Sequence, residues 1–256
     1  MEKIQMGDFS LAYDRRGRGA PLMLIHGFPL DHSIWDEVAP FLENDFDLIL
    51  PDLRGMGQSD STSATYTMAD LADDMAALLD HLGLRSAFVA GHSMGGYVAL
   101  AFAQGHASRV RGLALVASQA AADSPERKAG RYQEAANIAE NGAGDTVAAM
   151  TTKLSADERV RKFVHDLMKK QSPAGMIGSI KAMAERRDTL SALVAASFPL
   201  ALIHGDADAL IPISRAQEIQ AAVPRAKMFA LRGIGHMPMM ESPREVAEAI
   251  RVWVKP

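Results

Sequence analysis

The strongest constraint on the fold comes from short apolar runs that alternate along the chain with longer, helix-like segments. Each run has about four to six residues, is rich in Leu, Ile and Val, and lacks the polar alternation of a strand with one exposed face. The runs are Leu22–Ile25, Phe46–Leu50, Ala87–Ala90, Leu113–Val116, Leu200–Ile203 and Met228–Leu231. Strands buried on both faces have this pattern, so the sequence predicts an α/β fold with a mostly parallel central sheet and helices on both faces.

Local signals add a hairpin and capped helices to this sheet. Lys3–Met6 and Ser10–Tyr13 flank a Gly-Asp turn, which indicates an antiparallel hairpin. Thr67–Asp70 is a variant of the capping box, and Gly83 stands where the helix that follows should end. Residues 244–253 follow a proline and predict a last helix.

The segment from 119 to 198 interrupts the alternation of strands and helices. It has helical patterns but no convincing strand run, and it is richer in Lys, Arg and Glu than its flanks. The alternation resumes at Pro199. We interpret this segment as a helical insertion in one α/β core, which residues 1–118 and 199–256 form.

Composition and charge exclude several classes of protein. The 256 residues include 27 basic and 31 acidic side chains, a net charge of −4, and no cysteine. No clustered basic face indicates a nucleic-acid partner, and disulfides, thiolate zinc sites and cysteine nucleophiles are excluded. No metal cluster or phosphate-binding glycine loop is evident, so we expect no cofactor.

The chain lacks the apolar segments that direct proteins to membranes. The first residues have no stretch suited to a signal peptide, and no window approaches the roughly 18 apolar residues of a membrane helix. We expect a cytoplasmic, soluble protein. The sequence leaves its oligomeric state open.

Gly91, Ser93 and Gly95 form a Gly-x-Ser-x-Gly turn between a predicted strand and a predicted helix. Such a turn holds the serine in strained backbone geometry and requires small neighbours, which the glycines supply. Three fixed letters recur by chance in roughly one chain in ten of this length, so the placement of the motif counts for more than its letters. Ser93 is therefore a candidate nucleophile; the alternative is that it merely ends a tight turn.

The loop His26–Pro29 directly follows the run Leu22–Ile25. It can aim the backbone N–H of Phe28 at the same point as the N–H of Met94, and two convergent donors stabilise the oxyanion of a tetrahedral intermediate. We therefore expect an oxyanion hole at Phe28 and Met94. The alternative is an ordinary turn that uses Gly27.

Two carboxylates, Asp206 and Asp208, follow the run Leu200–Ile203. One of them should fix the tautomer of a catalytic histidine and stabilise its imidazolium form. The other should cap the turn or accept hydrogen bonds from backbone amides. The residues alone do not distinguish the two.

His236 follows the run Met228–Leu231 in a glycine-containing turn, where its imidazole can reach Ser93. A side chain that is neutral near pH 7 suits a general base. The alternative is a plain loop histidine. We expect the histidines beside motif turns to orient loops or fill space: His26, His92 and His204. We expect the remaining four on the surface without a special role: His32, His81, His106 and His165.

With these residues the chain resembles the α/β-hydrolases, in particular small members such as 3-oxoadipate enol-lactonase, haloperoxidase-type esterases and carbon–carbon bond hydrolases. The order serine, acid, histidine is that of this family. The matching stretches are His26–Pro29, Pro51–Ser59, Gly91–Gly95, Gly205–Pro212 and Gly233–Pro238. The resemblance is specific for the fold and much less so for the substrate.

The resemblance distinguishes between Asp206 and Asp208 and implies a position for the insertion. The family pattern of Gly, two residues, Asp, three residues and Pro implies Asp208. Residues 119–198 are implied to form a helical cap over the site, and Phe28 and Met94 to supply the oxyanion amides. Family dehalogenases and epoxide hydrolases carry aspartate at the nucleophile position, so neither activity is expected for a chain with Ser93.

The activity implied is hydrolysis of a small ester or lactone through Ser93, His236, Asp208 and an acyl-enzyme. On the same three residues, a carbon–carbon bond hydrolase or a hydroxynitrile-lyase-type enzyme is the alternative. A ligand-binding receptor of hydrolase fold is an alternative of another class, which the intact triad argues against. A non-catalytic interaction protein is a further alternative, because fold alone does not determine function.

Apolar residues beside the motifs suggest a small hydrophobic acyl pocket. Trp35, Met237 and Met239 are the candidates, and methionine adapts to irregular shapes. The alternative is that these side chains simply fill the core. Arg186 and Arg187 in the insertion are candidates to bind a substrate carboxylate. We favour the alternative, in which this cluster forms a salt bridge at the end of a helix.

Overall fold

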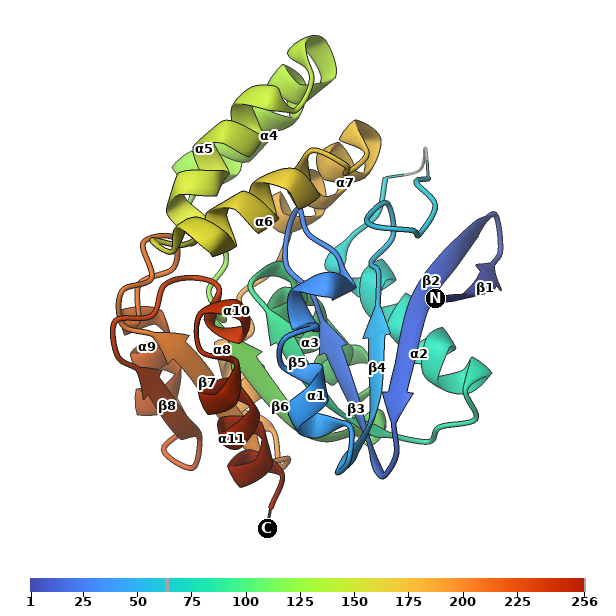
Figure 1. Cartoon of the computed structure of the whole chain (residues 1–256), viewed down its shortest axis with the longest axis vertical. Helices are drawn as coiled ribbons and strands as arrows, with labels where there is room; N and C mark the ends of the chain where they lie inside the picture. Colours follow the sequence, from blue (N-terminus) through green and yellow to red (C-terminus); the bar gives the residue numbers. More distant parts are fainter. Residues whose placement is uncertain (63–64, 256) are drawn as a thin grey trace.

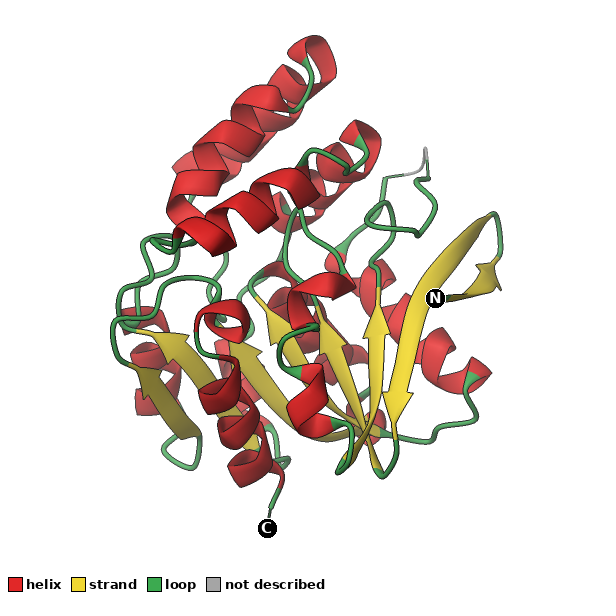
Figure 2. Ribbon diagram, in the orientation of Figure 1, coloured by secondary structure: helices red, strands yellow, loops and turns green. Residues whose placement is uncertain are grey.

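An eight-stranded sheet forms the centre of the computed structural model, which describes residues 1–62 and 65–255 (Figure 1 and Figure 2). The spatial order of the strands is β1-β2-β4-β3-β5-β6-β7-β8. Their bounds are β1 (Glu2–Met6), β2 (Phe9–Gly17), β3 (Ala20–Ile25), β4 (Phe46–Pro51), β5 (Ala87–His92), β6 (Val110–Val116), β7 (Leu200–Gly205) and β8 (Lys227–Leu231). Pro256, the last residue of the expected core, lies outside the described residues.

Each apolar run and both arms of the hairpin fall within a strand of this sheet. β1 pairs antiparallel with β2, and β2 with β4. The later strands, from β3 to β8, pair with one another in parallel. The prediction of a mostly parallel sheet is confirmed.

Residues of one strand alternate between two buried layers, which explains why the runs lack polar residues. In β3, Met23 and Ile25 pack into one core cluster, and Leu22 and Leu24 pack into the other. Successive side chains of a strand point to opposite faces of the sheet. A sheet with helices on both faces therefore needs apolar side chains at every position.

Helices cover both faces of the sheet (Figure 1). The front layer in this view contains α1 (Ala39–Leu42), α10 (Pro238–Glu241) and α11 (Pro243–Val254), together with the 3-10 turn η1 (His32–Trp35). The rear layer contains α2 (Met68–His81), α3 (Met94–Gly105) and α9 (Ser214–Ala222). In the described part of the chain, no helix combines the length and the apolar character needed to cross a bilayer.

The signals that predicted the limits of α2 are present in the structure. Thr67 caps the helix in a reciprocal capping box with Asp70. Gly83, just after the helix, has a φ of +68°, in the left-handed region that favours glycine.

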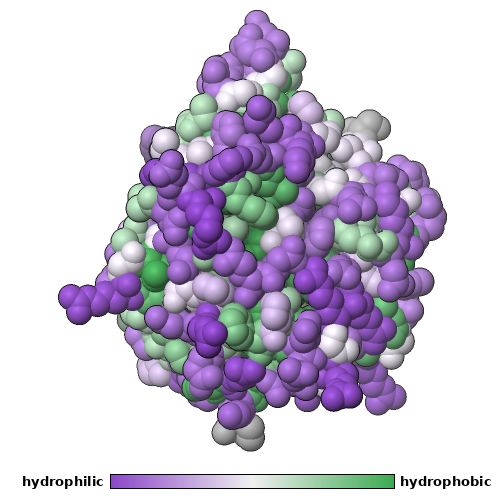
Figure 3. Space-filling view, in the orientation of Figure 1, coloured by the Kyte–Doolittle hydropathy of each residue, from purple (hydrophilic) through white to green (hydrophobic). Residues whose placement is uncertain are grey.

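Segment 119–198 is helical and contains no strand. Its helices are α4 (Pro125–Asn141), α5 (Gly144–Leu154), α6 (Glu158–Met168), α7 (Pro173–Ala184) and α8 (Leu190–Ala195). Helices α4–α7 lie above the carboxyl ends of the parallel strands, and we call these four helices the cap (Figure 1). In contrast, α8 packs against α9 beside the sheet. Figure 3 shows hydrophilic residues over much of the outer face of the cap and apolar residues where it meets the core.

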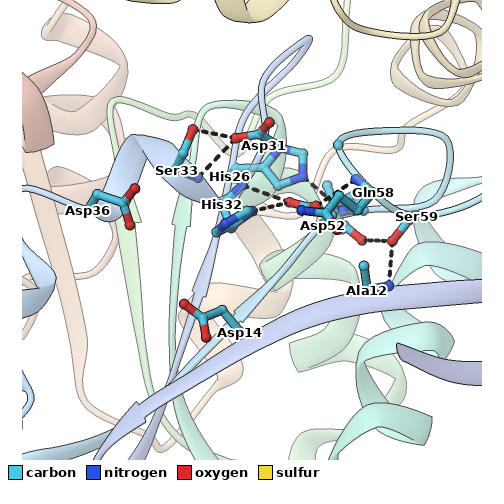
Figure 4. Close-up of polar contacts among 12 residues, drawn as sticks. Ala12, Asp14, His26, Asp31, His32, Ser33, Asp36, Asp52, Gln58 and Ser59 are labelled. Carbon is cyan, nitrogen blue, oxygen red and sulfur yellow. Dashed lines mark hydrogen bonds and ion pairs between the residues drawn. The ribbon is translucent and has the colours of Figure 1, made fainter. Parts of the chain in front are cut away.

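A hydrogen-bonded network joins the loops that follow β3 and β4 (Figure 4). The fully buried carboxylate of Asp52 accepts bonds from the backbone N–H and Nδ1–H of His32, at 2.9 and 2.7 Å, and from the amide of Gln58 at 2.8 Å. His26 Nε2 accepts a bond of 2.8 Å from the amide of Leu53. These bonds hold together the two loops beside the carboxyl ends of the central strands.

The prediction that His32 is a surface histidine without a special role is wrong. Its side chain is only 14% exposed and pairs with the buried Asp52. Burial lowers the pKa of His32, but the hydrogen bond and the charge of Asp52 outweigh it and raise the pKa overall. The two residues belong to different loops, so no local sequence pattern joins them.

Substitution of Gly95 by alanine should strongly destabilise the fold, because a Cβ there would lie 2.4 Å from the backbone oxygen of Ile25. We expect Gly95→Ala to lower the free energy of unfolding by about 2–3 kcal/mol in urea titrations. Gly105→Ala is the matched control in the same helix, because no atom lies within 4 Å of its added Cβ. Equal stability of the two variants would contradict this close packing.

The His32–Asp52 pair should stabilise the fold more at low pH than at high pH. A histidine whose pKa is raised by folding stabilises fully below its unfolded-state pKa of about 6.5, and this contribution is lost as pH rises through the folded-state pKa. The difference in unfolding free energy between the parent and His32→Asn should thus be larger near about pH 6 than near about pH 8.5. His81→Asn, at an exposed histidine, should show no such trend.

Candidate active site

Ser93 lies between the end of β5 and the start of α3, in strained backbone geometry. Its φ and ψ are 51° and −114°, a backbone conformation that residues other than glycine rarely adopt. The glycines on either side allow this turn, because a Cβ on Gly91 would lie 2.2 Å from the backbone oxygen of Gly95. Ser93 itself lines a cavity beneath the cap. The strained turn thus holds Ser93 against the wall of this cavity.

Asp208 and His236 meet above the ends of β7 and β8. The imidazole Nδ1–H donates to Asp208 Oδ2 at 2.7 Å, and both side chains are buried. Burial alone would raise the pKa of Asp208, but hydrogen bonds from His204 and His236 outweigh it and hold the pKa well below its usual range. The carboxylate is therefore ionised and orients the imidazole.

Asp206, the competing carboxylate, does not reach the imidazole. It is exposed, and its Oδ1 accepts a bond of 2.6 Å from the amide of Gly233. It therefore braces the turn before His236, which is the role expected for the second acid. The choice of Asp208 agrees with this geometry.

The ring nitrogen of His236 that faces away from Asp208 is free. Nε2 is buried and has no hydrogen-bond partner among the described residues, so it is not bonded to the hydroxyl of Ser93 in this structure. In the neutral tautomer with the proton on Nδ1, Nε2 is the acceptor of the ring. In structures without substrate, catalytic hydrogen bonds are often not formed and tighten only in the complex.

Glu241 holds the loop that carries His236, a role that was not predicted from the sequence. One oxygen of its carboxylate accepts from the amide of Gly235 at 2.8 Å, and the other accepts from the amide of Met237 at 3.2 Å. The amides on both sides of His236 are thus fixed by one side chain. An acidic residue a few positions after a glycine turn is the signal that could have indicated it.

Two further contacts hold the backbone of His236 itself. Its N–H donates to the carbonyl of Leu154 at 3.1 Å, at the end of cap helix α5. Its carbonyl accepts from Nε2–H of His92 at 2.9 Å. Burial, together with the neighbouring imidazole, lowers the pKa of His92 well below its usual value, so this side chain is neutral. The expectation that His92 orients a loop is confirmed.

Phe28 and Met94 have backbone amides suited to an oxyanion hole. The amide of Phe28 forms no hydrogen bond with the described residues, and Phe28 lines the cavity together with Ser93. Met94 is the first residue of α3, where helix amides lack partners within the helix. Both amides are therefore available to a ligand.

The cavity at Ser93 has a volume of about 330 Å³ and lies between the core and the cap. Its lining combines apolar and charged side chains from α4, α5, α7 and the loops after β3 and β7. This volume is at the small end of the range for ligand pockets. The cavity therefore suits a small molecule.

The prediction that Trp35, Met237 and Met239 line a substrate pocket does not agree with the structure. All three have no exposed surface and belong to the core cluster in front of the sheet. None of them lines the cavity at Ser93. These apolar side chains pack into the core between η1, α10 and the sheet.

Arg186 and Arg187 have different positions at the end of α7. Arg186 Nη2 donates to the buried carboxylate of Asp123 at 2.8 Å, so the favoured salt bridge is confirmed for Arg186. Its guanidinium carbon lies 4.2 Å from the centre of the Tyr97 ring. Arg187 lines a separate cavity of about 680 Å³, which shares Tyr97 with the cavity at Ser93.

Asp31, His32 and Asp52 place three atoms of the kind that bind metals within 4.8 Å of one another. Both oxygens of Asp52 accept hydrogen bonds within the protein. One oxygen of Asp31 accepts from the amide and the hydroxyl of Ser33 (Figure 4). These internal partners explain the positions of the carboxylates, so we assign this cluster a structural role.

Comparisons with known proteins agree with this geometry. Residues 20–243 match the model of a family described as alpha/beta hydrolase fold. A thermophilic esterase from Thermogutta terrifontis, in a malate-bound structure, is 33% identical, with a TM-score of 0.95 over 100% of this chain and 98% of the esterase.

Two curated relatives extend the comparison. The dihydrolipoyllysine-residue acetyltransferase component of the acetoin cleaving system of Pseudomonas putida is 30% identical over 99% of this chain and 69% of its own length. A pimeloyl–acyl-carrier-protein methyl ester esterase from Aeromonas hydrophila is 26% identical over 96% of this chain and 99% of its own. The chain therefore belongs to the alpha/beta hydrolase fold family.

Proposed function

We propose that this protein is a serine hydrolase that cleaves a small ester or lactone through an acyl-enzyme. The observation that carries the proposal is the hydrogen bond of 2.7 Å between His236 and Asp208. It leaves Nε2 of the imidazole free to accept a proton. The strained Ser93 at the floor of a small cavity supplies the nucleophile that such a base requires.

Each residue has one role in the proposed reaction. Nε2 of His236 takes the proton of Ser93 as the hydroxyl oxygen attacks the ester carbonyl, and Asp208 stabilises the imidazolium. The amides of Phe28 and Met94 hold the oxyanion. The imidazolium then protonates the leaving alcohol, and a water molecule activated by the same base releases the acid.

The known activities of similar proteins support an ester as substrate. An esterase from Thermogutta terrifontis and a methyl ester esterase from Aeromonas hydrophila both align over nearly the whole of this chain. The volume of about 330 Å³ favours a small ester over a long acyl chain or a polymer.

Replacement of Ser93 by alanine should abolish most turnover, because the acyl-enzyme can no longer form. On a short-chain aryl ester, kcat should fall by about a thousandfold or more. Labelling by a fluorophosphonate, read as the mass of the intact protein, should be lost with it. Ser214→Ala is the matched control, because Ser214 is exposed at the start of α9. Substantial turnover by Ser93→Ala would refute the assignment of the nucleophile.

The two carboxylates after β7 should differ sharply when each is replaced by asparagine. Asp208→Asn removes the acceptor that sets the histidine tautomer, and kcat should fall by about a thousandfold or more. Asp206→Asn keeps an oxygen that can accept from Gly233, so kcat should change by less than about tenfold. Steady-state kinetics on one aryl ester checks both. A larger loss in Asp206→Asn would reverse the assignment.

A further inference from the structure

Cationic side chains from the cap line the cavity that contains Ser93. Arg127 and Arg131 come from α4, and Lys153 comes from the end of α5. Glu134 is the acidic side chain among the lining residues. The wall that the cap contributes therefore has more positive than negative charge.

A shared carboxylate leaves part of this positive charge without a counterion. Arg127, Arg131 and Arg186 all form ion pairs with Asp123. Its side chain is only 1% exposed, so it lies behind the arginines. Burial raises the pKa of Asp123, but its bonds to Arg186 and Arg131 outweigh this and lower the pKa overall. Three guanidinium groups thus surround one carboxylate, which leaves two positive charges in excess.

Lys153 adds a charge that no carboxylate neutralises. Its side chain is exposed, and it forms no ion pair or hydrogen bond with the described residues. The other cap lysine close to this region, Lys128, is paired with Glu185 instead. An unpaired ammonium at the edge of a small cavity attracts an anionic group on a ligand.

Apolar side chains line the same cavity. Met150 and Met183 come from the cap, and Leu210 and Ile211 follow β7 beside Asp208. The lining of one small cavity thus combines Ser93, apolar side chains and cationic side chains. A molecule that fits all three parts has a reactive carbonyl, a short apolar stem and an anionic end.

From this arrangement we infer that the substrate is an ester whose end remote from the scissile bond is a carboxylate, received by Lys153 and Arg127. This inference rests on the proposed function and adds the substrate class to it. Lys153 provides a point charge, and the N–H groups of Arg127 that do not face Asp123 can bind a carboxylate oxygen. The small, mostly hydrophobic acyl pocket predicted from the sequence would instead prefer the apolar ester.

Two methyl esters that differ only at the remote end test the inference. Monomethyl glutarate and methyl pentanoate have the same chain length, and a pH-stat measures the hydrolysis of both. We expect kcat/KM to be about tenfold or more higher for monomethyl glutarate. The preference should weaken as ionic strength increases, because salt screens exposed charges.

Charge-changing variants should move the ratio of the two kcat/KM values in opposite directions. Lys153→Met and Arg127→Met should each lower the ratio by about tenfold, and Lys153→Arg should largely preserve it. Glu134→Gln should raise the ratio by about threefold, because it removes the opposing charge. Lys162→Met is the matched control, since Lys162 is an exposed cap lysine paired with Asp166.

The outcomes separate this inference from the proposed function. If methyl pentanoate is the better substrate, or if Lys153→Met and Lys162→Met leave the same ratio, the carboxylate assignment is wrong. Hydrolysis that still depends on Ser93 in that case leaves the proposed function intact. Hydrolysis of a neutral aryl ester that survives Ser93→Ala removes both.

Discussion

Close backbone packing around the turn that carries Ser93 is the constraint on which the rest of the site depends. A Cβ on Gly91 would lie 2.2 Å from the backbone of Gly95, and a Cβ on Gly95 would lie 2.4 Å from the backbone of β3. This contact draws α3 against the sheet and leaves Ser93 at a φ of 51°. The serine is consequently held at the carboxyl end of the sheet, the end at which β7 and β8 deliver Asp208 and His236.

Hydrogen bonds from three parts of the structure hold the loop that carries His236, and one of these parts is the cap. Glu241 fixes the amides on either side, His92 binds the carbonyl, and Leu154 of α5 accepts the N–H. None of these contacts uses a ring nitrogen of His236, so they position the loop and leave the imidazole to its bond with Asp208. The cap therefore contributes to the position of His236 as well as to the walls of the cavity.

The electrostatics of the core and the cap have opposite character. At the core, buried carboxylates are matched by histidines: Asp208 by His236 and Asp52 by His32. In the cap, three arginines share the single carboxylate of Asp123. The matched pairs set orientation, while the unmatched positive charge faces a cavity and is available to a ligand.

The sequence by itself determined the sheet, the nucleophile turn and the order of the chemical groups. Short apolar runs without alternation favour strands buried on both faces, and the glycines on either side of Ser93 allow a tight turn. The choice of Asp208 over Asp206 also came before the structure, although from a family pattern rather than from the residues. Each of these features depends on short stretches of chain, where local sterics decide the outcome.

Tertiary structure alone decided which side chains face the cavity. Trp35 and Met239 are apolar beside the site, but an apolar side chain suits a core and a pocket equally, and packing placed them in the core. The pairing of His32 with Asp52 and the cationic wall with Lys153 likewise arise when segments far apart in the chain meet. Such contacts cannot be predicted from neighbouring residues in the sequence. Which side chains are buried and which charges form pairs depends on how the helices and the sheet pack together.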